Sequence, residues 1–252
     1  MTDSLLNCIL LNARSIKNKL LDLHYLLYSG GADCVFITES WLNNDITAGL
    51  LDPKNEFVVF RNDRSGLTGG GVCAIIRKSL NARRVDMAQL DSRVEMLCLD
   101  IYGANVINRF FLVYRPPDSS RGYIGCSDYV SNVLSCSECY LNSKGPTIVL
   151  GDFNCTDINW VGCCVPSNHV SSQLYNFAVT NGFMQAVNKP TRVDLVLINQ
   201  PFSLSALSVE PPFSSSDHNS VNFKVVFNRY IPVIQYYQLL DLQVKVRVSE
   251  SE

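Results

Sequence analysis

The stretch that decides the fold prediction is Thr147–Asn154, which reads TIVLGDFN. Its first four residues favour a strand and lead directly into Gly151, the carboxylate of Asp152 and the carboxamide of Asn154. Strand ends are where α/β folds gather ligand sites, because the loops there vary over a rigid base. The stretch therefore predicts a buried strand that ends in a polar site.

A second polar stretch, Ser214–Asn219, reads SSSDHN and places the carboxylate of Asp217 beside the imidazole of His218. Oxygen ligands suit Mg²⁺, and a histidine near them can do acid–base work or stabilise charge. For one Asp or Asn alone, an ordinary cap or turn is the better interpretation. Both stretches in one chain instead favour metal-assisted hydrolysis of a phosphodiester.

The composition fits a globular protein without a membrane partner. The chain has 252 residues, of which 47% are hydrophobic and 17% charged, enough for one large α/β domain or two small ones. No apolar run approaches the roughly 18 residues of a spanning helix, and the N-terminus has no basic segment typical of a signal peptide. The net charge of −2 gives no positive support for nucleic-acid binding, although local patches can still be basic.

Ten cysteines without a secretion signal predict reduced, mostly buried thiols. The pairs Cys136/Cys139 and Cys163/Cys164 lack a matching second pair at zinc-site spacing. We therefore expect no disulfides and an intracellular protein, either cytosolic or nuclear.

Apolar runs bounded by turn residues predict many strands and few helices. Strands are expected at 8–11, 34–38, 57–60, 72–76, 94–101, 110–114, 147–150, 183–187, 193–198, 204–209 and 221–227. Helices are expected after a cap at Ser15, around Val130 and Leu134, and after a cap at Ser171 or Ser172. This pattern predicts two mixed sheets packed face to face with helices outside.

Seven short motifs occur in a fixed order between residues 7 and 227. They are LNARSI at 11–16, ITESWL at 37–42, GGGV at 69–72, VYRPP at 113–117, LGDFN at 150–154, DLVL at 194–197 and SDHN at 216–219. The ordered set resembles the endonuclease/exonuclease/phosphatase superfamily. More narrowly, it is similar to the apurinic-endonuclease-like domain of LINE-type (non-long-terminal-repeat) retrotransposons.

The resemblance implies a fold, an activity and partners. The implied fold is an α/β, DNase-I-like four-layered sandwich of two mixed β-sheets flanked by helices, over residues 1–228. Residues 229–252 form an atypical tail. The implied activity is an endonuclease that uses Mg²⁺ or Mn²⁺ to nick DNA, and we expect it to act as a monomer.

The resemblance also implies metal ligands. Glu39 would be the main ligand with Asn12 beside it, and Asp217 would complete the metal or phosphate environment. A cation is needed because the phosphodiester is negative and a poor electrophile. The two tryptophans, Trp41 and Trp160, are expected to be packing residues.

The remaining roles concern the reaction itself. Asp152 would orient or deprotonate the attacking water, and Asn154 would hold this water and the phosphate. His218 would stabilise the transition state, with Asp194 fixing its orientation. Tyr114 would contact the scissile phosphate.

One departure from the family pattern keeps alternatives open. The motif KPTR at 189–192 is followed almost directly by the DLVL motif that begins at Asp194. In the retrotransposon domains a loop of several residues separates the two motifs. A catalytically impaired remnant that keeps the fold is therefore one alternative. A phosphatase or phospholipase of the same superfamily is another, which the segments Asn12–Ser15 and Tyr114–Pro117 argue against.

Overall fold

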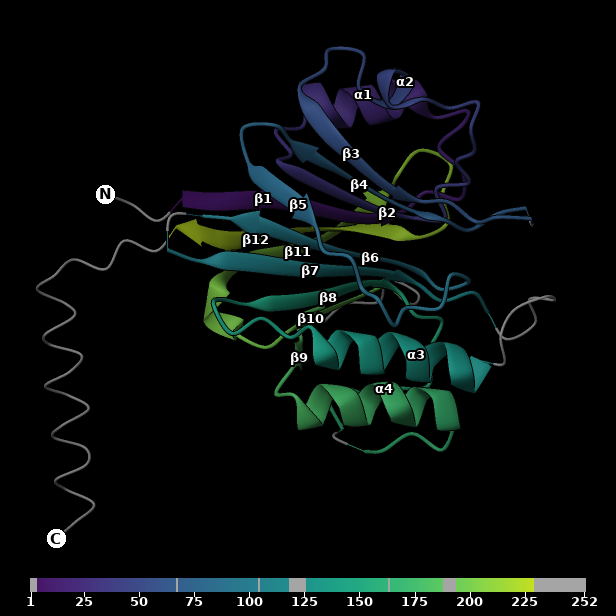
Figure 1. The fold of residues 1–252 in the computed structure, drawn as a ribbon, viewed down its shortest axis with the longest axis vertical. Helices are drawn as coiled ribbons and strands as arrows, with labels where there is room; N and C mark the ends of the chain where they lie inside the picture. Colours follow the sequence, from purple (N-terminus) through teal and green to yellow (C-terminus); the bar gives the residue numbers. More distant parts are fainter. Residues whose placement is uncertain are drawn as a thin grey trace, which may run out of the picture.

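The protein is a sandwich of two six-stranded β-sheets with helices on both outer faces (Figure 1). A computed structural model describes residues 4–66, 68–103, 105–117, 126–162, 164–187 and 194–228. The helices α1 and α2 cover one sheet, and α3 and α4 cover the other (Figure 1). The predicted four-layered α/β sandwich is thus confirmed.

The first sheet has the strand order β11-β12-β1-β2-β4-β3. Its β1 and β2 are parallel, and its other neighbours are antiparallel. Because β1 also pairs with β12, the first and last described segments of the chain lie side by side. The strands are β1 (Ser4–Asn12), β2 (Cys34–Thr38), β3 (Phe57–Asn62), β4 (Val72–Arg77), β11 (Leu204–Pro212) and β12 (Asn219–Asn228).

The second sheet has the order β5-β6-β7-β8-β10-β9, with only β7 and β8 parallel among its described pairs. Its strands are β5 (Asn81–Arg84), β6 (Glu95–Tyr102), β7 (Ile107–Tyr114), β8 (Thr147–Asp152), β9 (Met184–Gln185) and β10 (Asp194–Ile198). Every predicted strand is present. The strand β5 was not predicted, because its sequence NARR has no apolar run.

The helices are α1 (Leu20–Tyr28), α2 (Ala48–Leu51), α3 (Cys126–Cys139) and α4 (His169–Thr180), with a 3₁₀ turn η1 (Pro201–Ser203). The predicted cap at Ser15 is wrong. Ser15 has a φ of 80°, and its N–H donates to the carbonyl of Glu39 at 2.9 Å. The loop after β1 is therefore bound to the loop after β2, and α1 begins only at Leu20.

The predicted cap of α4 is also wrong. Asn168 caps this helix, because its side-chain oxygen accepts from the N–H groups of Val170 and Ser171 at 2.9 and 3.2 Å. Ser171 lies inside the helix and is buried. The end of α4 near Asn181 and Gly182 agrees with the prediction.

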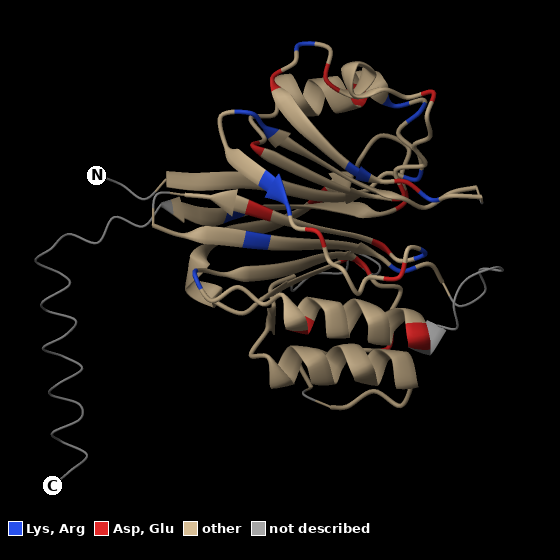
Figure 2. Cartoon of the chain, viewed as in Figure 1, with Lys and Arg blue, Asp and Glu red and all other residues tan. Residues whose placement is uncertain are grey.

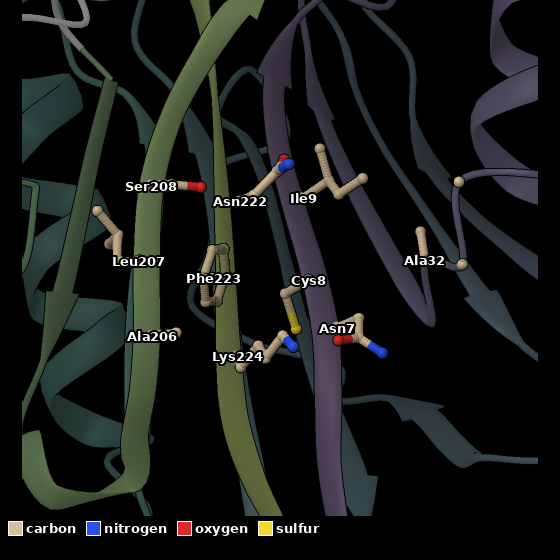
Figure 3. Close-up of a pocket in the computed structure, with 12 residues that line it drawn as sticks. Asn7, Cys8, Ile9, Ala32, Ala206, Leu207, Ser208, Asn222, Phe223 and Lys224 are labelled. Carbon is tan, nitrogen blue, oxygen red and sulfur yellow. The ribbon is translucent and has the colours of Figure 1, made fainter.

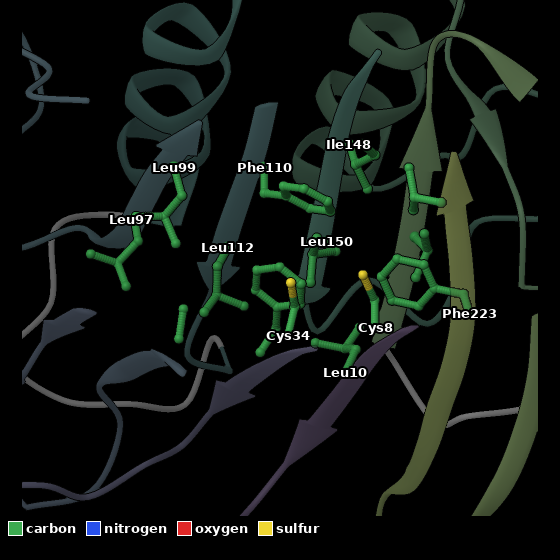
Figure 4. Packing of buried hydrophobic residues seen from close by; sticks show 14 of the residues in the cluster. Cys8, Leu10, Cys34, Leu97, Leu99, Phe110, Leu112, Ile148, Leu150 and Phe223 are labelled. Carbon is green, nitrogen blue, oxygen red and sulfur yellow. The ribbon is translucent and has the colours of Figure 1, made fainter. Parts of the chain in front are cut away.

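Apolar side chains fill the space between the two sheets (Figure 4). Phe36 of β2 stacks on Phe110 of β7 with ring centroids 4.9 Å apart. Leu10, Leu112 and Leu150 complete the middle of this layer and are fully buried. Because protein cores pack as densely as organic crystals, this layer fixes the position of one sheet's strand ends relative to the other's.

Eight cysteines of the described part of the chain are free thiols, and six of those eight are buried. Within that part, no helix has the length and apolar character needed to span a membrane. The predicted tail at 229–252 and the short connection at 188–193 lie outside the described residues.

Candidate active site

The predicted site residues gather at one end of the sandwich, on the right in Figure 1. Asn12, Tyr114 and Asp152 are the last residues of β1, β7 and β8, and Asp194 is the first residue of β10. In the second sheet, Asp152 pairs with Tyr114 on one side and with Asp194 on the other. The strand register therefore brings these polar side chains together from distant parts of the sequence.

Asn12 connects the carboxylates of the two sheets. Its Nδ2 donates to Glu39 Oε1 at 3.0 Å and to Asp152 Oδ2 at 2.9 Å. Its Oδ1 accepts from the Arg14 N–H at 3.1 Å, and the residue is fully buried. In this arrangement Asn12 lies beside Glu39, as predicted, and its nitrogen holds two carboxylates in place.

A divalent cation has a suitable donor set in this place. Glu39, Asp152 and His218 each offer one ligand atom, and these atoms all lie within 4.8 Å of one another. In the described part of the chain they form the one such group of three or more. Carboxylate oxygens suit Mg²⁺ and Mn²⁺, and imidazole is a common ligand of the heavier divalent metals. Glu39 and Asp152 could therefore hold the cation, with His218 beside it.

Asp217 lies outside this group. Its Oδ2 forms an ion pair with Arg14 Nη1 at 2.9 Å, near the molecular surface. The Arg14 side chain is about half exposed, so its guanidinium is accessible from solvent. Basic (blue) and acidic (red) segments both occur at this end of the molecule in Figure 2, so the mouth of the site carries charges of both signs.

The imidazole of His218 is held by a buried carboxylate. Its Nδ1 lies 2.9 Å from Oδ2 of Asp194, whose side chain has no exposed surface. Burial lowers the pKa of His218, but the hydrogen bond and the charge of Asp194 outweigh it, so the pKa is raised from its ordinary value. Burial also raises the pKa of Asp194, although its bond with His218 opposes the shift. The pair thus favours a charged imidazole in a fixed orientation.

The backbone of His218 is fixed as well. Its N–H donates to Ser216 Oγ at 3.2 Å, and Ser216 Oγ in turn donates to the carbonyl of Asn12 at 2.6 Å. The loop that carries His218 is therefore attached to the end of β1. The predicted pairing of Asp194 with His218 is present in the structure.

Asp152 sits in an environment that disfavours its charge. Burial and the nearby charge of Asp194 raise the pKa of Asp152 to about 7. Gly151 precedes it with a φ of 137°, and a Cβ there would lie 1.9 Å from the carbonyl oxygen of Val113. Only glycine permits this approach, which sets the direction of the Asp152 side chain.

Asn154 turns the chain back toward β7. Its N–H donates to Asp152 Oδ1 at 3.0 Å, and its Nδ2 donates to the carbonyl of Arg115 at 2.7 Å. Asn154 has a φ of 49°, a left-handed conformation that asparagine tolerates better than most residues. It therefore orients Asp152 through its backbone, and its side-chain nitrogen is engaged by a carbonyl.

Tyr114 lies beside the carboxylates and is 4% exposed. Burial, followed by the negative charges of Glu39 and Asp152, raises the pKa of its phenol. The phenol therefore stays protonated at ordinary pH and remains a hydrogen-bond donor. Tyr129 fixes the Tyr114 backbone by donating its hydroxyl to the Tyr114 carbonyl at 2.6 Å.

The prediction for Trp41 needs a correction. The residue is exposed, at 38%, and its Nε1 donates to Glu39 Oε2 at 3.2 Å. Trp41 therefore contacts the candidate metal ligand instead of filling the core. Trp160, by contrast, packs against Tyr175 with ring centroids 6.0 Å apart, as expected of a packing residue. The signal for Trp41 was its position two residues after Glu39.

A separate cavity of about 480 Å³ lies over β1, β11 and β12 (Figure 3). Its lining combines polar residues such as Asn7 and Lys224 with apolar ones such as Ile9 and Phe223, and includes none of the residues in the carboxylate group. The chemistry-bearing residues are therefore at the strand ends and not in this cavity.

Comparison with solved structures shows the same fold in several nucleases. The endonuclease domain of TRAS1, a telomere-specific non-LTR retrotransposon, superimposes with a TM-score of 0.67 over 90% of this chain and 100% of that chain, at 15% identity. An AP endonuclease from Archaeoglobus fulgidus gives 0.64 over 89% and 100%, at 13% identity. A 3' phosphatase, NExo, from Neisseria bound to a product DNA hairpin gives 0.64 over 87% and 99%, at 15% identity.

Sequence comparison agrees at the level of the family. No curated protein matches the chain by sequence. The sequence profile of the Endonuclease/Exonuclease/phosphatase family, however, matches residues 9–218, which include both loops that carry the candidate metal ligands and the segment with His218. Profile, fold and strand-end carboxylates agree, and the chain belongs to the endonuclease/exonuclease/phosphatase family.

Proposed function

We propose that the protein is a metal-dependent endonuclease that hydrolyses phosphodiester bonds of DNA, derived from a LINE-type retrotransposon. The observation that carries the proposal is the convergence of Glu39, Asp152 and His218, whose ligand atoms lie within 4.8 Å of one another. The fold shared with the TRAS1 endonuclease domain supports the retrotransposon origin. The proposal includes Mg²⁺ or Mn²⁺ as cofactor, action as a monomer, and a nuclear location where DNA is the substrate.

In this mechanism Asp152 acts on the water. As a ligand of the cation Asp152 is ionised, and its carboxylate orients the attacking water. The water oxygen attacks phosphorus and loses its proton to solvent, and the bond from phosphorus to the leaving oxygen breaks. The products are a phosphomonoester and a hydroxyl, with solvent protonating the leaving oxygen. Asn154 keeps Asp152 in place through its N–H.

The remaining residues act on the phosphate. Glu39 and Asp152 would hold the divalent cation, which when bound supplies positive charge to the phosphate oxygens. His218, kept charged by Asp194, stabilises the negative charge that grows on those oxygens in the transition state. The Tyr114 hydroxyl donates a hydrogen bond to the phosphate. Its raised pKa keeps this hydroxyl protonated at neutral pH.

A second candidate is a phosphatase that removes a terminal phosphate from DNA. It is favoured by the fold shared with NExo, described as a 3' phosphatase. The same carboxylate and imidazole set would serve a phosphomonoester. The two candidates differ in substrate, because only the endonuclease cuts a circular DNA that has no ends.

The deciding experiment is nicking of supercoiled plasmid with Mg²⁺, with Mn²⁺ and with EDTA. We expect open-circular product with metal and none with EDTA. Glu39→Gln and Asp152→Asn should abolish nicking while leaving the circular dichroism spectrum unchanged. Asp86→Asn is the matched control, because this side chain is 98% exposed and outside the site.

Two results would count against the endonuclease. Release of phosphate from a 3'-phosphorylated oligonucleotide without plasmid nicking would favour the phosphatase. Absence of both activities with either metal would favour the catalytically impaired remnant that keeps the fold.

A further inference from the structure

Both carboxylate oxygens of Glu39 accept a hydrogen bond. Asn12 Nδ2 donates to Oε1 at 3.0 Å, and Trp41 Nε1 donates to Oε2 at 3.2 Å. The terminal torsion of a glutamate side chain is broad, so a free carboxylate samples many orientations. Two donors, one on each oxygen, restrict the rotation of the Glu39 carboxylate about this torsion. Hydrogen bonds to an ionised acceptor are stronger than neutral ones, which makes this restraint effective.

The backbone around Glu39 and Trp41 adopts an unusual conformation. Glu39 has a φ of 48° and Trp41 a φ of 52°, in the left-handed region that bulky residues seldom occupy. Two backbone bonds hold it: Trp41 N–H donates to the Gly70 carbonyl at 2.8 Å, and Ser40 N–H donates to the Gly71 carbonyl at 3.1 Å. Such conformations persist where surrounding structure over-determines them, and they cluster at functional sites.

The turn at Gly70 and Gly71, whose carbonyls accept these hydrogen bonds, is held in turn by Arg64 and Glu95. A Cβ at Gly70 would lie 2.1 Å from Arg64 Cζ, so the guanidinium packs directly against the turn. Arg64 Nε donates to Glu95 Oε1 at 2.6 Å, and the other oxygen of Glu95 accepts from the Gly71 N–H. A buried ion pair therefore fixes the turn, the turn fixes Trp41, and Trp41 reaches Glu39.

We infer that Trp41 is a positioning residue for the metal site: its indole N–H sets the orientation in which Glu39 meets a divalent cation. The inference rests on the proposed role of Glu39 as a metal ligand and goes beyond it. Groups that hydrogen-bond to metal ligands orient them, and their loss typically costs about 10- to 100-fold in metal affinity. Loss of the Trp41 N–H should therefore weaken metal binding by a factor in this range.

The experiment measures Mn²⁺ binding without substrate, by electron paramagnetic resonance and by calorimetry. The main variant is Trp41→Phe, which removes the N–H and keeps an aromatic ring. The matched control is Trp160→Phe, the same change at the other tryptophan, which packs against Tyr175. Glu39→Gln defines binding outside the site. A second form carries benzothienylalanine at position 41, which replaces the N–H by sulfur and preserves the shape of the ring system.

We expect Trp41→Phe and the sulfur isostere to raise the Kd for Mn²⁺ by about 10- to 100-fold, and Trp160→Phe to leave it unchanged. In nicking assays the same two forms should need more metal for half-maximal rate, with a much smaller change in rate at saturating metal. An unchanged Kd in the isostere overturns the inference. So does an equal loss in Trp160→Phe, or a wild-type protein that binds no Mn²⁺.

The binding measurement separates this inference from the proposed function. A wild-type protein that binds Mn²⁺ but cleaves no DNA refutes the endonuclease. The comparison of Kd values then still decides whether Trp41 positions Glu39.

Discussion

The hydrogen bond between His218 and Asp194 is the part of the site whose removal has a calculable effect. Asp194→Asn keeps the volume of the side chain and removes its charge. The distance from His218 Nδ1 to Asp194 Oδ2 is 2.9 Å, and the Asp194 side chain has no exposed surface. Water therefore cannot take the place of the lost interaction. The variant should fold and should hold His218 less firmly in its charged form.

The magnitude follows from the strength of such bonds. A hydrogen bond to a charged group contributes about 1.5–3 kcal/mol and a neutral one about 0.5–1.5 kcal/mol. The asparagine oxygen can still accept from His218 Nδ1, so Asp194→Asn loses the difference, roughly 1–1.5 kcal/mol. Since each 1.36 kcal/mol or so corresponds to a tenfold change in rate, the nicking rate should fall by about tenfold. His218→Ala removes the donor itself and should cost more, about 10²- to 10³-fold in kcat.

The pH profile gives a second readout of the same pair. The charge and hydrogen bond of Asp194 raise the pKa of His218 against the opposing effect of burial, and the imidazole is charged below that pKa. The rate should therefore fall as pH rises through the raised pKa. Asp194→Asn lowers the pKa, so this fall should move to lower pH.

The assay is single-turnover nicking at saturating Mn²⁺ across the pH range, with His24→Ala as control, since His24 lies on α1 outside the site. A wild-type rate and an unshifted profile in Asp194→Asn would refute a functional role for the pair. A loss equal to that of His218→Ala would refute the view that Asp194 acts only by orienting and charging the imidazole.

Three further outcomes are expected. Mn²⁺ should raise the Tm more at about pH 8 than at about pH 6. Asp152 has a pKa of about 7 without metal and must lose its proton before it binds a cation. An equal gain in Tm at both pH values would exclude Asp152 as a ligand. Arg64→Ala disrupts a buried pair with Glu95 and should cost about 3–5 kcal/mol by urea unfolding, whereas Arg93→Ala in an exposed pair should cost much less; equal losses would show that burial of the pair does not matter. Gly151→Ala should lower both Tm and nicking, because its Cβ would lie 1.9 Å from a backbone oxygen, and a wild-type Tm would show that the strands can separate there.

The strands were predictable from sequence because both sheets bury apolar runs. Segments such as Cys34–Thr38 and Thr147–Asp152 are buried at every position, so a continuous apolar run was sufficient to identify them. The strand Asn81–Arg84 lacks such a run and depends on its pairing with β6. Helix starts were less predictable: the backbone around Ser15 follows its bond to the Glu39 carbonyl, a contact that no local pattern reveals.

In the candidate site, too, some features were predictable from sequence and others were not. The positions of Asp152 and Asp194 at strand ends were predictable, because each adjoins an apolar run, and His218 was identified by its Asp217 neighbour. The bridging role of Asn12 was not, since its partners lie 27 and 140 residues away. The sequence predicts Trp41 to be a packing residue, and only the structure shows its indole N–H bonded to Glu39. Contacts of this kind depend on how the loops meet in space.

The candidate site is shared between the two sheets, and this ties its chemistry to the packing of the whole sandwich. Glu39 follows a strand of the first sheet, and Asp152 ends a strand of the second. Asn12 is hydrogen-bonded to both carboxylates, and the apolar layer that includes Phe36 and Phe110 lies between the sheets. A small shift of one sheet against the other would separate the two carboxylates while leaving each sheet intact. The fold therefore contributes to the proposed chemistry by setting the distance between two halves of a metal site, and neither half has a complete donor set alone.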